Sequence, residues 1–60
     1  MSNLNWELIH QTWAELRDAL QVAESEFEAD QIQDAMIQLE RLARLNGVTF
    51  KHDGIMKGEG

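Results

Sequence analysis

The sequence contains no cysteine and no proline, and all four of its glycines lie at or beyond Gly47. Without cysteine, the chain can form neither a disulfide nor a thiolate metal site. Without proline or glycine before Gly47, no residue type in the first part of the chain interrupts a helix. Long uncharged apolar runs and a basic N-terminal cluster are also absent, so we expect no membrane span and no signal peptide, and predict a cytoplasmic protein.

The chain has 60 residues, which is room for one domain. A chain of this length buries a modest fraction of its surface and is often marginally stable alone. Since disulfides and thiolate metals are excluded, stability must come from helix packing and self-association.

The chain has a net charge of −6, and its charged residues are distributed unevenly along the sequence. Residues 1–40 hold nine acidic residues against one arginine, and residues 41–60 hold four basic residues against two acids. Such an acidic chain is poorly suited to phosphate backbones and better suited to a basic protein surface. Direct nucleic-acid binding is therefore the weakest function considered, and it would depend on Arg41, Arg44, Lys51 and Lys57.

Apolar residues follow a heptad-like pattern in the first half of the chain. From Trp6 to Phe27, they recur at alternating intervals of three and four positions. This spacing is typical of an amphipathic helix that buries one stripe against another helix. Asn5 can cap its first turn, so we predict a helix over about residues 5–26. The predicted seam on this helix consists of Trp6, Ile9, Trp13, Leu16, Leu20, Ala23 and Phe27.

A second helix is predicted over about residues 31–46, because the apolar pattern changes phase over residues 28–31. Two N-caps compete for its start, since Ser25 opens a capping-box pattern and Asp30 opens a variant of it. Asp30 is preferred because it keeps Phe27 on the first seam. One long helix with a local kink is the alternative. The seam residues predicted on this helix are Ile32, Met36, Leu39 and Leu42.

The pattern changes again after Gly47, which lies where a left-handed residue closes a helix. Residues 48–51 alternate like a strand, and Asp53-Gly54 is a favourable pair for a two-residue hairpin turn. Residues 55–57 could then form the return strand, and the last residues are expected to be disordered.

These elements predict an all-α antiparallel helical hairpin over residues 1–47, followed by an extended or β-hairpin-like tail over residues 48–60. Two amphipathic helices cover only one side of each other, and wet apolar surface costs roughly 25 cal/mol per Å². Two hairpins packed back to back would form a homodimeric four-helix bundle that buries both faces. The alternative is a monomer in which the tail folds over the open face.

Few side chains are candidates for chemistry. Zinc needs three or four protein ligands, and the chain has only His10 and His52, which we interpret as a polar residue beside the seam and a turn residue. No nucleophile motif and no glycine-rich phosphate loop is present. We therefore predict no enzyme activity, no metal and no cofactor. Trp6 and Trp13 are interpreted as core residues, with a partner-binding anchor as the alternative.

Five acidic residues around the predicted turn form the densest charge feature. They are interpreted as a solvated tip, and alternatively as a patch that docks on a basic groove. The sequence thus predicts a small acidic protein–protein interaction module, a regulator or adaptor that works as a helical-hairpin dimer. The alternative is an acidic inhibitor that mimics nucleic acid and blocks a basic DNA- or RNA-binding protein. The candidate partner-binding residues are Glu24, Glu26, Glu28, Asp30 and Asp34.

Overall fold

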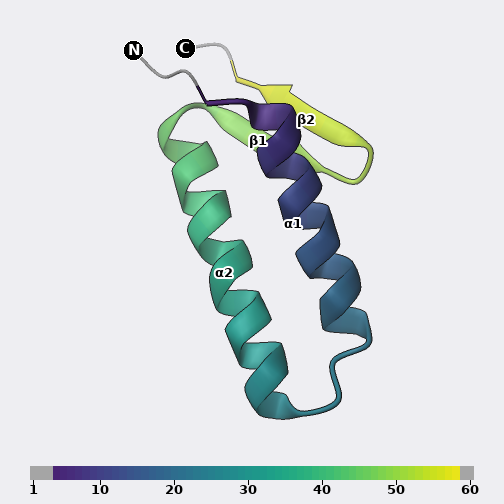
Figure 1. The fold of residues 1–60 in the computed structure, drawn as a ribbon. Coiled ribbons are helices and arrows are strands. Elements are labelled where there is room, and N and C mark those ends of the chain that lie inside the picture. Colours follow the sequence, from purple (N-terminus) through teal and green to yellow (C-terminus); the bar gives the residue numbers. More distant parts are fainter. Residues whose placement is uncertain (1–3, 59–60) are drawn as a thin grey trace.

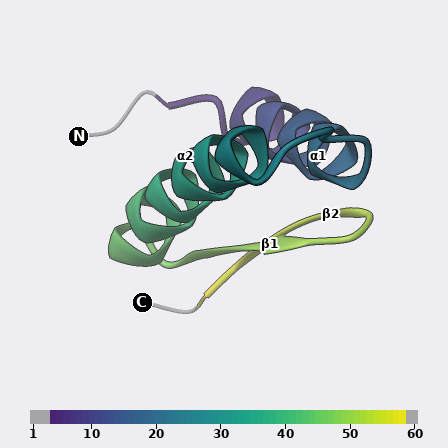
Figure 2. The ribbon, with the colours of Figure 1, turned by 90° about the horizontal axis from the view of Figure 1, so that it is seen from below.

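Two antiparallel helices and a two-stranded sheet make up the computed structural model, which describes residues 4–58 (Figure 1). Helix α1 comprises Trp6–Gln21 and α2 comprises Glu26–Leu45, and strands β1 (Val48–Lys51) and β2 (Gly54–Lys57) pair antiparallel. The β-hairpin lies against one face of the helix pair (Figure 2), at the end where α1 begins and α2 ends. The predicted helical hairpin is confirmed, and its tail is a β-hairpin that folds over the helices.

Helix α1 begins where the sequence predicted. The side chain of Asn5 accepts a hydrogen bond from the backbone N–H of Leu8 at 3.2 Å, which satisfies one of the free donors of the first turn. Glu7 also lies in the first turn, where the positive end of the helix dipole stabilises its charge.

The turn between the helices lies at residues 22–25, so its predicted position at residues 28–31 is wrong. Helix α1 ends at Gln21 rather than near residue 26, and α2 begins at Glu26 rather than near residue 31. The chain therefore reverses direction before Phe27, the last residue of the predicted first seam.

The capping residue of α2 explains this difference. Ser25 is the N-cap, because its Oγ accepts a hydrogen bond from the Glu28 backbone N–H at 3.1 Å and donates to the Glu28 carboxylate at 3.3 Å. Asp30 lies inside α2 and does not cap it. The capping box therefore forms at Ser25, although this position removes Phe27 from the first helix.

Helix α2 ends at Leu45, two residues before the predicted glycine. Gly47 adopts a φ of 70°, which a residue without a side chain adopts at little cost. Val48 follows as a buried residue, and the Gly58 N–H donates to the Gly47 carbonyl at the base of the β-hairpin. Disorder was predicted for residues 58–60; this hydrogen bond shows that the prediction is wrong for Gly58, and residues 59–60 lie outside the described residues.

The loop of the β-hairpin differs from the prediction by one residue. Lys51 pairs with Gly54, so the loop consists of His52 and Asp53, and Gly54 is the first residue of β2. Within residues 4–58, every positive φ belongs to a glycine. His52 and Asp53 therefore do not form the turn with two positive φ angles that an Asp-Gly pair favours.

The core is thin. Ala43 (1% exposed) and Val48 (5% exposed) are the buried residues of the described chain, and both lie where α2 meets β1. The molecule is elongated, with extents of 39 × 19 × 17 Å. Neither helix within residues 4–58 combines the length and the apolar character that crossing a membrane requires.

Candidate functional site

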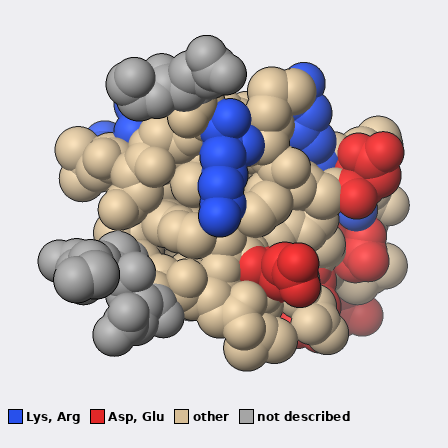
Figure 3. All heavy atoms as spheres, turned by 90° about the horizontal axis from the view of Figure 1, so that it is seen from above, with Lys and Arg blue, Asp and Glu red and all other residues tan. Residues whose placement is uncertain are grey.

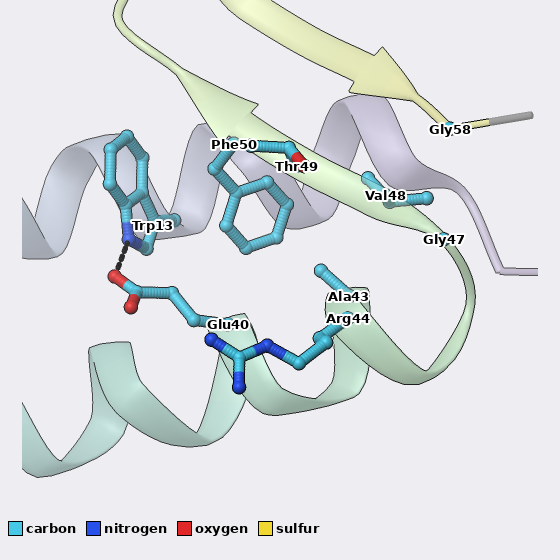
Figure 4. A pocket seen from close by; sticks show the side chains of 9 residues that line it. All are labelled: Trp13, Glu40, Ala43, Arg44, Gly47, Val48, Thr49, Phe50 and Gly58. Carbon is cyan, nitrogen blue, oxygen red and sulfur yellow. Dashed lines mark hydrogen bonds between the residues drawn. The ribbon is translucent and has the colours of Figure 1, made fainter.

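A shallow groove of about 500 Å³, open to solvent, lies beneath β1 (Figure 4). At one end, the indole Nε1–H of Trp13 donates to Glu40 Oε2 at 2.9 Å, which joins α1 to α2. Within the described chain, the side chains of Arg44 and Thr49 make no hydrogen bond, so the groove contains no paired nucleophile and base. The groove is lined by Trp13, Glu40, Ala43, Arg44, Gly47, Val48, Thr49, Phe50 and Gly58.

An aromatic cluster next to this groove holds the β-hairpin on the helices. The Phe50 ring lies 5.5 Å from the Trp13 ring, 5.8 Å from the His10 ring and 6.3 Å from the Trp6 ring, all between centroids. His10 and Trp13 contact each other as well, at 5.5 Å. These tilted and edge-on contacts fall in the range that favours aromatic pairing. Phe50 thus occupies the centre of the interface between β1 and α1.

Polar contacts fix the β-hairpin at its loop end. His10 Nε2 lies 2.6 Å from the Lys51 carbonyl oxygen, so that ring nitrogen carries the donated proton. Arg17 donates through Nη1 to His52 Nδ1 at 2.9 Å, and its guanidinium carbon lies 5.3 Å from the centroid of the Trp13 ring. Arg17 therefore joins the loop to α1 by a hydrogen bond and a cation–π contact.

The two histidines and Arg17 have roles that the sequence did not indicate. His10 was interpreted as a polar residue beside the seam and His52 as a turn residue, and both also anchor the β-hairpin. Arg17 and Phe50 were not identified at all. For Phe50, the one signal in the sequence is its alternation with Val48, which places both on the same face of β1.

Most of the predicted seam is half-buried, and its exposed members lie on α2. Phe27 is 72% exposed, because it lies on α2 beyond the turn, and Leu42 is also exposed. The remaining seam side chains are half-buried within one chain. These are Trp6, Ile9, Trp13, Leu16, Leu20, Ala23, Ile32, Met36 and Leu39.

The five acidic candidates are all exposed, but they do not share one face. Glu24 lies in the turn, and Glu28 belongs to the capping box of α2. Glu26, Asp30 and Asp34 follow at intervals of four, which places them along another side of the same helix.

The opposite end of the molecule, viewed along the helices, carries both charge types (Figure 3). Most of the surface there is neither acidic nor basic, lysine and arginine side chains lie among these neutral residues, and acidic side chains gather towards one side. Among the described residues, the face seen in Figure 3 is therefore not uniformly charged.

The described residues contain no group of three or more histidine, aspartate or glutamate side chains placed to hold a metal ion. The arrangement joins structural elements and offers exposed apolar and charged surfaces. No protein-family model matches the chain, and no match is found among curated proteins or solved structures.

Proposed function

We propose that this protein is a small protein–protein interaction module that works as a dimer of helical hairpins and regulates or adapts a further protein. The observation that carries the proposal is the set of large apolar side chains that one chain leaves exposed to solvent.

The small core supports the proposal, because the described residues bury only Ala43 and Val48.

Large apolar side chains are exposed to solvent on both helices. Leu8 on α1, and Phe27, Ile37 and Leu45 on α2, are all exposed, and Leu45 reaches 84%. Covering such side chains stabilises an assembly by about 25 cal/mol per Å². The β-hairpin does not cover them, although it folds over the seam.

The alternative function, an acidic inhibitor of a nucleic-acid-binding protein, has weaker support. A mimic of a phosphate backbone needs its carboxylates on one surface, and Glu28 lies on a different side of α2 from Asp30 and Asp34.

Light scattering over micromolar to millimolar concentration tests the dimer. We expect a mass of twice 6.9 kDa and a thermal midpoint that rises with concentration, as mass action requires. A mass of one chain at every concentration, with a constant midpoint, would contradict the proposal. For the second partner, cross-linking in the native cells should capture a protein other than the chain itself.

A further inference from the structure

The side of α2 that faces away from α1 carries a self-complementary stripe of charges. We propose that two copies of the chain pair along this stripe, with their α2 helices antiparallel. The inference rests on the dimer proposed above and names its interface. The α2 stripe consists of Phe27, Asp30, Asp34, Ile37, Arg41 and Arg44.

The spacing of these residues places them on one side of the helix. They follow one another at intervals of three, four, three, four and three positions, which is the spacing of one helical stripe. All six are exposed, whereas Ile32, Leu39 and Ala43, which are half-buried or buried, lie on the opposite side of α2. The α2 stripe is therefore free to meet another molecule.

The charges on the α2 stripe have no partner within residues 4–58. The side chains of Asp30, Asp34, Arg41 and Arg44 make no hydrogen bond or ion pair there. Asp30 and Asp34 lie one turn apart and repel each other. The helix dipole favours acids in the first turn and bases in the last, but its effect falls off within one turn. It therefore accounts for Arg44, which is in the last turn, and not for Asp30, Asp34 or Arg41.

An antiparallel second copy gives Asp30 and Arg41 a neighbour of opposite charge. With a two-fold axis beside Asp34 and Ile37, Asp30 of one copy lies opposite Arg41 of the second copy. Phe27 then lies opposite Arg44 of the second copy, within reach of a cation–π contact. Ile37, which is 46% exposed, lies near the axis and is covered.

A parallel pairing fails on the same residues. It would place Asp30 and Asp34 against their own copies and Arg41 against Arg41, and like charges in contact repel each other. The α2 stripe thus specifies both the partner, a second copy of this chain, and its orientation.

Charge exchange tests the interface. The variant Asp30→Lys/Asp34→Lys makes the stripe wholly basic, and Arg41→Glu/Arg44→Glu makes it wholly acidic. We expect the dimer dissociation constant of each variant alone to rise about tenfold or more. An equimolar mixture should form a heterodimer, and a chain with all four substitutions should dimerise again, because the opposite charges meet once more.

A matched control is Glu15→Lys/Asp18→Lys on α1, which changes the net charge by the same amount as Asp30→Lys/Asp34→Lys. It should dimerise like the parent chain. Recovery in the mixture and in the fourfold variant shows that the separate variants are folded. If the Asp30→Lys/Asp34→Lys variant dimerises like the parent chain, or if the mixture forms no heterodimer, the proposed interface is wrong. The proposal that the chain forms a dimer is not affected by that result. If the parent chain is monomeric at every concentration, both proposals fail.

Discussion

Replacing Phe50 with alanine removes the side chain that holds the β-hairpin against the helices. Phe50 is half-buried and its ring contacts Trp6, His10 and Trp13. An aromatic side chain buries about 200 Å² when fully covered. Half of that area, about 100 Å², corresponds to about 2.5 kcal/mol at about 25 cal/mol per Å². Domains have a free energy of unfolding of about 0.05–0.15 kcal/mol per residue, so this loss is a large share of the total.

Urea denaturation followed by tryptophan fluorescence measures this loss, since both tryptophans lie next to Phe50. In thermal denaturation of the same variant, the midpoint should fall by about 10–20 °C, given about 4–8 °C for each kcal/mol in a domain of this size. Met56→Ala is the control, because Met56 lies on the other face of the β-hairpin and is exposed. If Phe50→Ala costs no more than Met56→Ala, the β-hairpin does not dock as described and the reasoning is refuted.

Two further predictions concern the ends of α2, and both use urea denaturation at a concentration where the chain is monomeric. Ser25→Ala should lower the free energy of unfolding by about 1 kcal/mol, because it removes the N-cap, whereas Asp30→Asn should change it by less than about 0.5 kcal/mol. If the two substitutions lower the free energy of unfolding equally, Ser25 is not the N-cap of α2 and the turn does not lie at residues 22–25. Gly47→Ala should cost about 1–2 kcal/mol, because alanine pays for the left-handed φ of 70°; an unchanged stability would contradict that backbone conformation.

Local signals in the sequence predicted the elements of the fold. Asn5 and Gly47 mark the start of α1 and the end of α2, and the alternation from Val48 marks β1. The turn was misplaced because the three-four spacing from Trp6 continues to Phe27 although the chain reverses between them. Regular spacing of apolar residues indicates which face of a helix is buried, but it does not indicate where the chain changes direction. The capping box at Ser25 was the sequence signal that marked the start of α2.

The candidate site was not predictable in the same way. His10 and Lys51 are 41 positions apart, and Arg17 and His52 are 35 apart. A local pattern reports on contacts within a few turns of helix or strand, so it cannot show that these segments meet. Dimerisation through any surface stays a prediction, because it depends on contacts with a molecule outside the chain.

The position of the thin core has a consequence for the order of assembly. Ala43 and Val48, the buried pair, are five positions apart, whereas His10 reaches Lys51 across 41 positions. Closing the longer loop costs about 2 kcal/mol more in chain entropy. We expect the C-terminal part of α2 and β1 to associate before the β-hairpin docks on α1.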